Sequence, residues 1–352
     1  MKNTRYLKIQ VIYEGKDITN DISKDIISFD YSDSINEFDS LNLTIQNRKR
    51  LWMNSWNPLK GDKLKVNVYL FNWEIEDRVI NIPVGTFYID KVSYSGIPDI
   101  VSISALSVNV TTNIMDDKKN HVWESVSFKK IVEDIAKQSK LDLIYDCKFE
   151  RNYIRVEQKL ESNFNFLKRL GEEIGVVIKL YNNKLIVFEE TVYEKKESKL
   201  LITRDDIENY NLEIDDTDTY AGCKITYTDS SGKKMEATFF SKQRSGYKRN
   251  TKRVLLINED KAIPGKDKSK VREYLGKIAE KALRNKNKNS IRANIQMIGK
   301  EKVLSVGDCI ELLSFGIFNG KYMITKISTD LTTYNLNLEL QRVEESDNDD
   351  RN

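Results

Sequence analysis

The acidic residues of this chain are the side chains that could carry out hydrolysis. Asp215, Asp216 and Asp218 form one cluster, and Glu172 and Glu173 form another. Paired carboxylates serve as acid and base in glycoside hydrolysis, the reaction of a peptidoglycan hydrolase. The first cluster lies in a predicted turn that lacks the glycine and distal glutamate of a calcium loop. The second lies near a predicted helix end, so solvated carboxylates are the competing interpretation of both.

Other catalytic and metal-binding arrangements find little support. The single histidine, His121, excludes multi-histidine zinc sites, and its polar surroundings indicate a surface residue. Cys147, Cys223 and Cys309 are odd in number and widely spaced, so we expect reduced thiols and no CxxC pair. No GxxxxGK[ST] phosphate loop occurs. We therefore expect no cofactor and no bound metal.

Basic residues gather late in the chain. Residues 241–253, which include Lys252 and Arg253, and residues 266–288 could contact nucleic acid, because Tyr247 lies among the basic side chains. The alternatives are a solvated surface and an interface with an acidic neighbouring protein. The whole chain has 57 Lys and Arg against 54 Asp and Glu, so its bulk charge does not indicate a nucleic-acid binder.

Three tryptophans lie close together in the first quarter of the chain. Trp52, Trp56 and Trp73 follow a predicted strand at 41–47. They are candidates either for core packing or for anchors of a protein interface, where tryptophan concentrates binding energy.

Length and hydropathy limit the architecture. A chain of 352 residues suits two or three domains, and 39% hydrophobic residues are enough for buried cores. The first residues contain no apolar segment of signal-peptide length, and no run approaches about 18 apolar residues. We expect synthesis in the bacterial cytoplasm without a signal peptide, and no membrane contact.

Alternating and helical patterns divide the chain into parts. Short alternating strands over 1–115 and again over 201–345 are typical of a β-barrel or sandwich, and the second part also contains a predicted helix at 268–286. Between them, the pattern of 116–200 predicts a small α/β domain with two helices. The cap candidate of the first helix is Ser127, and that of the second is Ser162 or Asn163. The acidic segment 346–352 is predicted to be disordered. The predicted fold class is mainly β with an α+β insert.

The two β regions repeat one another. VGTFYIDKVS at 84–93 matches NGKYMITKIS at 319–328, which pairs Gly85 and Lys91 with Gly320 and Lys326. Gly61-Asp62 and Gly307-Asp308 each precede an alternating strand. Two further matches are Leu41, Leu43 and Ile45 with Ile291, Ala293 and Ile295, and Val101, Ile103 and Ala105 with Leu336, Leu338 and Leu340.

Four matches in one order predict two homologous antiparallel β-barrels in one chain. Each repeated glycine is expected to allow positive φ at a turn. Three copies of such a chain would place six similar barrels around one axis. A near-sixfold ring built from a trimer suits an adaptor between a hexameric object and a trimeric one.

The chain resembles the phage late control gene D proteins, the baseplate hub proteins of contractile tails, which are related to type VI secretion spike hub domains. The resemblance covers nearly the whole chain, and its most specific segments are IQVIYEGKDITNDIS (9–23), NRKRLWMNSWNPLKGDKL (47–64) and PVGTFYIDKVSYSGIPDIVSISALSV (83–108). It implies two tail-tube-like barrels and a structural protein without enzymatic activity. It does not distinguish a phage from a phage-tail-like bacteriocin.

The resemblance also implies partners. The hub would be a homotrimer in the baseplate of a tail particle, with the tail tube protein above and a trimeric spike protein below. Other baseplate proteins and the tape-measure protein would be neighbours, and nucleic acid would pass only in transit through the channel. Because the chain ends about where the second barrel ends, we expect the spike and any wall-degrading enzyme to be separate gene products.

Overall fold

The computed structural model describes residues 4–35, 37–109, 114–115, 117–229, 231–241, 251–259, 263 and 267–343. The predicted disordered tail at 346–352, Tyr247 and most of the basic segment 241–253 lie outside the described residues.

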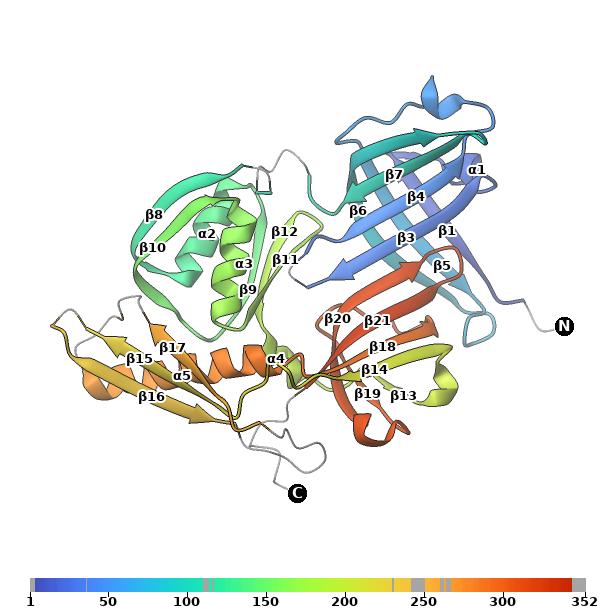
Figure 1. Cartoon of the computed structure of the whole chain (residues 1–352). Coiled ribbons are helices and arrows are strands. Elements are labelled where there is room, and N and C mark those ends of the chain that lie inside the picture. Colours follow the sequence, from blue (N-terminus) through green and yellow to red (C-terminus); the bar gives the residue numbers. More distant parts are fainter. Residues whose placement is uncertain are drawn as a thin grey trace.

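The largest element is a 13-stranded sheet whose two halves lie side by side (Figure 1). The first half, here called the first repeat sheet, contains β1 (Tyr6–Tyr13), β2 (Lys16–Asp17), β3 (Ile26–Ser34), β4 (Ser40–Gln46), β5 (Lys63–Phe71), β6 (Val79–Ser95) and β7 (Ile100–Leu106), with helices α1 (Thr19–Ile22) and η1 (Leu51–Met53). The second repeat sheet contains β13 (Leu200–Ile202), β14 (Asn209–Ile214), β18 (Ile291–Ile298), β19 (Cys309–Leu312), β20 (Gly320–Asp330) and β21 (Asn335–Arg342), with helices η3 (Arg204–Asp206) and η4 (Gly316–Phe318).

The two repeat sheets have the same strand order. Hydrogen-bonded neighbours run β3-β4-β7-β6-β5-β1 in the first and β14-β18-β21-β20-β19-β13 in the second. The bulges also match, since pairing shifts between Ile89 and Lys91 in β6 and between Ile324 and Lys326 in β20. One strand differs, because β1 runs antiparallel to β5 whereas β13 runs parallel to β19. The predicted mainly β fold with two related antiparallel regions is confirmed.

One detail of the sequence alignment is wrong. The sequence alignment matches Leu41 with Ile291. In the structure, Leu41 lies opposite Ala105, and Ala105 is equivalent to Leu340 of the second repeat sheet. Leu340 lies opposite Ala293, so Ala293 is the true equivalent of Leu41. The structural equivalence of β4 and β18 is therefore shifted by two residues. A shift of two leaves every side chain on the same face of a strand, so alternation alone could not detect it.

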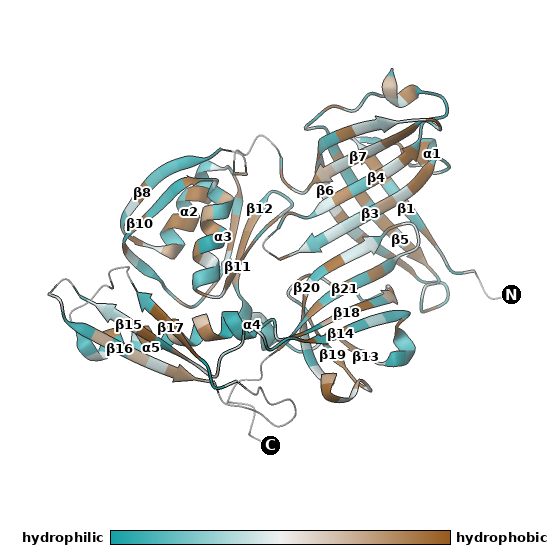
Figure 2. Cartoon of the chain, viewed as in Figure 1, coloured by the Kyte–Doolittle hydropathy of each residue, from teal (hydrophilic) through white to brown (hydrophobic). Residues whose placement is uncertain are grey.

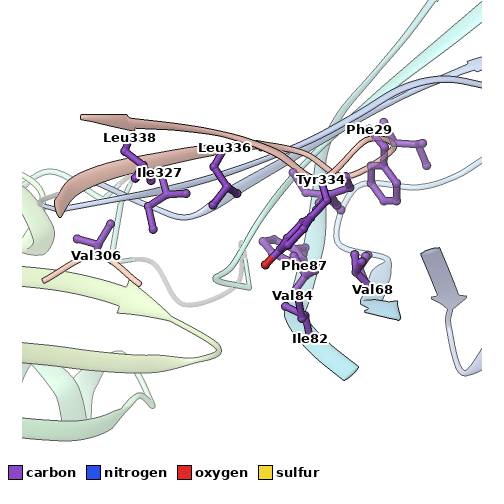
Figure 3. Close-up of a cluster of buried hydrophobic side chains, with 14 of the residues drawn as sticks. Phe29, Val68, Ile82, Val84, Phe87, Val306, Ile327, Tyr334, Leu336 and Leu338 are labelled. Atoms are coloured by element: carbon purple, nitrogen blue, oxygen red, sulfur yellow. The ribbon is translucent and has the colours of Figure 1, made fainter. Parts of the chain in front are cut away.

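A single hydrophobic core joins the two repeat sheets. Buried positions alternate with more exposed ones along the strands. Figure 2 shows hydrophobic and hydrophilic residues changing along the same ribbons. Phe29 and Phe87 from the first sheet and Leu336 and Leu338 from the second belong to one cluster (Figure 3). The burial of apolar surface thus holds the two halves together.

The insert forms a second core of its own. Its elements are β8 (Lys119–Ser127), α2 (Phe128–Gln138), β9 (Asp142–Asp146), β10 (Asn152–Glu161), α3 (Asn163–Glu173), β11 (Val176–Tyr181), β12 (Lys184–Glu189) and α4 (Glu190–Glu194). Ser127 is confirmed as a cap, because its hydroxyl accepts from Lys130 N. Of the two candidates for the second helix, Ser162 is the cap, because its hydroxyl accepts from Asn165 N. These bonds satisfy amide groups that have no partner within the helix.

The range 201–345 is not one continuous β region. Within it, β15 (Gly222–Thr228), β16 (Lys234–Phe240), β17 (Val254–Glu259) and α5 (Lys268–Asn287) form a separate three-stranded sheet with a helix packed on it and a third core. The predicted helix 268–286 is confirmed as α5. Short alternating strands look alike whichever sheet they join, so the sequence pattern did not separate this unit from the second repeat sheet.

Helix α5 is tied to the insert by buried ion pairs. Arg284 contacts Glu190 at 2.7 Å and also contacts Glu194, and Lys288 contacts Glu190 at 2.7 Å. Glu190 is 1% exposed, yet its pKa is lowered, because these two cations more than offset the effect of burial. The helix therefore has a fixed position against α4.

Candidate assembly interface

The two repeat sheets meet at a strand pairing, here called the repeat junction. Residues Lys326–Asp330 of β20 pair antiparallel with Asp30–Ser34 of β3, and Ile35 N extends the pairing by donating to Thr325 O at 3.0 Å. In Figure 1, β20 and β3 lie next to each other where the red and blue halves join. Backbone hydrogen bonds thus make the two sheets continuous, although their sequences are far apart.

A buried charge cluster lies at one end of the repeat junction. Lys179, from β11 of the insert, donates to Asp39 at 2.8 Å and to Asp33. Asp33 also accepts from Val306 N at 3.1 Å, and Tyr31 donates its hydroxyl to Asp39 at 3.0 Å. Asp39 is fully buried and Lys179 is 8% exposed. These bonds hold the first sheet, the second sheet and the insert at one point.

The charges of this cluster depend on one another. Burial, together with the negative charge of Asp33, raises the pKa of Asp39 to about 7. Burial also lowers the pKa of Lys179, but the adjacent carboxylates Asp33 and Asp39 more than offset it, so the net shift is upward. The Lys179 ammonium group therefore stays charged at neutral pH, and the Asp39 carboxyl group titrates near neutrality.

Stability should depend on pH through Asp39. Because its folded pKa of about 7 exceeds the ordinary value of 3.8, the folded state binds this proton more tightly than the unfolded chain does. The stabilisation is complete below about pH 4 and is lost as the pH rises through 7, with about 1.4 kcal/mol for each unit of pKa difference. Between pH 4.5 and 7.5, we expect the free energy of unfolding to fall less in Asp39→Asn than in the wild type. The difference between the two decreases should exceed about 1 kcal/mol.

Urea unfolding at the two pH values measures this difference. The matched control is Asp134→Asn, which removes a half-buried surface carboxylate that pairs with Lys130 at 2.7 Å within α2. If the wild type and Asp39→Asn lose the same stability over this interval, Asp39 does not titrate as described.

Trp73 contacts the second repeat sheet from the hairpin between β5 and β6. Its ring nitrogen donates to Gly299 O at 2.6 Å, and its ring meets Tyr334 edge to face at 5.7 Å. Arg78 from the same hairpin pairs with Glu301 at 2.9 Å. Of the three candidate tryptophans, Trp73 is therefore the one that joins the two sheets within one chain.

The repeated Gly-Asp pairs make the same turn twice. Gly61 and Gly307 have φ of 93° and 87°, a conformation that glycine adopts without steric cost. The Asp62 carboxylate accepts from Leu59 N at 2.7 Å, and the Asp308 carboxylate accepts from Ser305 N, also at 2.7 Å. The glycine turn and the aspartate hydrogen bond together give the chain the same path into the following strand in both sheets.

The other repeated residues also occupy equivalent places. Gly85 and Gly320 have φ of 138° and 134°. Gly85 lies opposite Val66, next to the bulge in the β5–β6 pairing, and Gly320 lies opposite Leu312, the last pair of β19–β20. Lys91 and Lys326 each follow the bulge of their strand. Their neighbours differ, since Lys326 pairs with Glu339 at 3.4 Å whereas Lys91 lies opposite Ser104.

The remaining interface candidates lie in two other places. Trp52 is buried against Trp56, with ring centroids 5.7 Å apart, in the loop after β4. Lys252 is exposed, and Arg253 donates to Thr219 O at 3.0 Å, just beyond the end of β14. Their roles as anchors for another protein remain predictions.

Three of the five candidate carboxylates, Asp215, Asp218 and Glu173, have hydrogen-bond or ion-pair partners. Asp215 accepts from Thr217 N at 2.9 Å, and a hydrogen bond from Lys286 lowers the pKa of Asp218. A general acid needs a raised pKa, so the lowered value at Asp218 opposes such a role. Glu172 is exposed, and Glu173 lies 3.9 Å from Arg169.

The surface of the described residues includes the following two hollows. One of about 390 Å³ is lined by Thr4, Tyr6, Asn72, Asp77 and Val79, and one of about 240 Å³ includes His121, Trp123 and Gln158. None of the five carboxylates lines either hollow. His121 is exposed and meets Trp123 edge to face at 4.5 Å.

The described residues contain neither a cluster of metal ligands nor a membrane-spanning helix. They contain no group of three or more His, Cys, Asp or Glu that could hold a metal ion. None of their helices has both the length and the apolar character needed to cross a bilayer. All three cysteines are free thiols, and Cys223 and Cys309 are buried.

The chain is similar in sequence to a phage baseplate protein. The chain is 24% identical over 268 residues to a probable baseplate hub protein of Escherichia phage 186, a match that covers 74% of this chain and 65% of the relative. The predicted resemblance is confirmed. This chain is similar to phage baseplate hub proteins. The match spans less than two thirds of the relative's own length, and no family model matches the sequence.

Solved structures of a prophage tail protein and of a type VI secretion component have a similar fold. The 43 kDa tail protein of prophage MuSo2 from Shewanella oneidensis aligns over 95% of this chain and 98% of its own, with a TM-score of 0.67 and 14% identity. An Escherichia coli type VI secretion component, described as structurally similar to bacteriophage T4 tail proteins, aligns over 97% of this chain and 77% of its own, with a TM-score of 0.57 and 12% identity.

Sequence reasoning missed the buried charge cluster. Asp33 and Asp39 are far in the sequence from Lys179, and nothing in the local sequence of the two aspartates sets them apart from exposed charges. The only available signal was Lys179 within the apolar run VVIKL of β11, a strand that is buried along almost its whole length.

Proposed function

We propose that this chain is the structural hub of a baseplate in a contractile tail particle. Three copies form a ring of six similar sheets that continues the tail tube above and receives a trimeric spike below. The observation that carries the proposal is the duplication: the two repeat sheets share strand order, bulge positions and turn geometry. The similarity to a probable baseplate hub protein supports the same role.

The duplication matters because of symmetry. A trimer of unduplicated subunits presents three equal surfaces, whereas a tube of hexameric rings needs six. Two equivalent sheets in one chain supply the six surfaces from three copies. The insert and the β15–β17/α5 unit carry their own cores. We propose that they lie outside the ring and contact other baseplate proteins, while the tape-measure protein and nucleic acid pass through the channel.

Light scattering of the purified chain and symmetry averaging of tail particles test the proposal. We expect an oligomer of three 41.0 kDa chains and a baseplate density with threefold symmetry that is nearly sixfold at the level of the repeat sheets. A monomer both in solution and in the assembled particle would contradict it.

We also propose that the hub is not an enzyme. Purified protein should leave no clearing in a gel that contains peptidoglycan, because none of the candidate carboxylates lines either of the two hollows described above. Asp216→Asn and Glu172→Gln serve as matched variants. Clearing by the wild type that either variant abolishes would establish the peptidoglycan hydrolase instead.

A further inference from the structure

Two of the open strand edges of the 13-stranded sheet lie on β14 and at the end of β6. Among the described residues, β14 pairs only with β18, and the Lys91–Ser95 end of β6 pairs only with β7, because the β5 pairing stops at Tyr88. Such edges present backbone donors and acceptors ready for another strand.

Both edges have counterparts that are paired within the chain. The β14 edge is equivalent to β3, and the Lys91–Ser95 end is equivalent to Lys326–Asp330 of β20. These two counterparts bind each other at the repeat junction. Within one chain, β3 and β20 therefore form one junction. The two strand edges that would form a second, equivalent junction, on β14 and at the end of β6, are not paired with each other.

From this equivalence, and on the basis of the proposed trimer, we infer that β14 of one copy pairs antiparallel with the Lys91–Ser95 end of β6 in the next copy. The expected partner is thus a second copy of this chain. The pairing continues the sheet from chain to chain, and a head-to-tail contact of this kind closes into a ring.

The register follows from pairings inside the chain. Tyr31 lies opposite Leu41, and the equivalent pair is Leu212 opposite Ala293. Ser32 is therefore equivalent to Glu213, and Ser328 to Ser93. Since Ser32 lies opposite Ser328, we place Glu213 opposite Ser93. The complete register is Lys91 opposite Asp215, Val92 opposite Ile214, Ser93 opposite Glu213, Tyr94 opposite Leu212 and Ser95 opposite Asn211.

The side chains of this register are complementary. Lys91 is exposed and would face the carboxylate of Asp215, and opposite charges on facing strands attract. Val92 and Ile214 are both only half-buried and both pack at the border of the shared core. Ile327, the counterpart of Val92 at the closed junction, is 4% exposed. Closing the second junction would bury the border residues in the same way.

Disulfide trapping of the full-length chain tests the register. In Ser93→Cys/Glu213→Cys, the cysteines of neighbouring copies would face each other directly, and mild oxidation should give covalent dimers and trimers on a non-reducing gel. The internal control is Ser32→Cys/Ser328→Cys, which places cysteines at the equivalent pair of the closed junction and should cross-link within one chain. The register control is Ser93→Cys/Asp215→Cys, shifted by two residues, which should cross-link at least tenfold more slowly.

A second cysteine pair tests the same contact in case the first double variant does not fold. Lys91→Cys/Asp215→Cys should give the same ladder, and its single variants should give none. If the wild type is a trimer and the internal control closes, but neither intermolecular pair cross-links, the inference is wrong and the proposed hub trimer stands. Faster cross-linking of the shifted pair would also overturn it. A wild type that is monomeric in solution and in particles would remove the proposed function together with the inference.

Discussion

Lys179→Met is expected to lower the free energy of unfolding by about 3–5 kcal/mol, because it leaves two buried carboxylates without their cation. Lys179 is 8% exposed and bonds to both Asp33 and Asp39. Methionine has a similar length, so most of the packing is retained and the lost charge causes the effect. Urea unfolding followed by tryptophan fluorescence measures the change.

A matched control separates this loss from the general effect of removing a lysine. Lys129→Met removes an exposed lysine that lies 3.9 Å from Glu133 in α2, and it should cost about 0.5 kcal/mol or less. The triple variant Asp33→Asn/Asp39→Asn/Lys179→Met should recover part of the lost stability, because no unpaired charge then stays buried. Equal losses for Lys179→Met and Lys129→Met would show that the buried cluster does not stabilise the fold.

Trp73→Ala is expected to cost about 3–5 kcal/mol, the range for removing a large aromatic side chain from a core. Trp73 is 8% exposed, donates to Gly299 O at 2.6 Å and packs against Tyr334. Its loss would open a cavity between the two repeat sheets. Chemical unfolding of the variant measures the cost.

Trp73→Phe divides this effect into its parts. Phenylalanine keeps most of the ring contact but leaves the buried Gly299 carbonyl without its donor, which costs about 1–3 kcal/mol. Trp56→Ala is the control, since Trp56 is half-buried in a loop of the first sheet alone. If Trp56→Ala destabilises the chain as much as Trp73→Ala, the contact between the sheets has no special weight.

Much of the repeat was readable in the sequence, because its turns need particular residues. The Gly-Asp pairs require a glycine at positive φ and a carboxylate that accepts from the amide three residues earlier, and both requirements left letters at matching positions. The helix caps Ser127 and Ser162 were predictable for a similar reason, since each bonds to an amide three residues away.

Other features depend on contacts between distant segments. The two-residue shift between β4 and β18 was invisible in the sequence, because alternation repeats every two residues and fits both alignments. The separate β15–β17/α5 unit was missed because a strand pattern does not say which sheet the strand joins.

The sequence by itself determined that a β pattern occurs twice, since turn chemistry and alternation are local properties that each segment carries with it. Only the tertiary structure decided which strand edges are closed and which are open, and which charges are buried. Asp33, Asp39 and Lys179 form a cluster because three units meet around them. Burial and edge pairing are properties of the assembled chain, because they depend on what lies beside a residue in space.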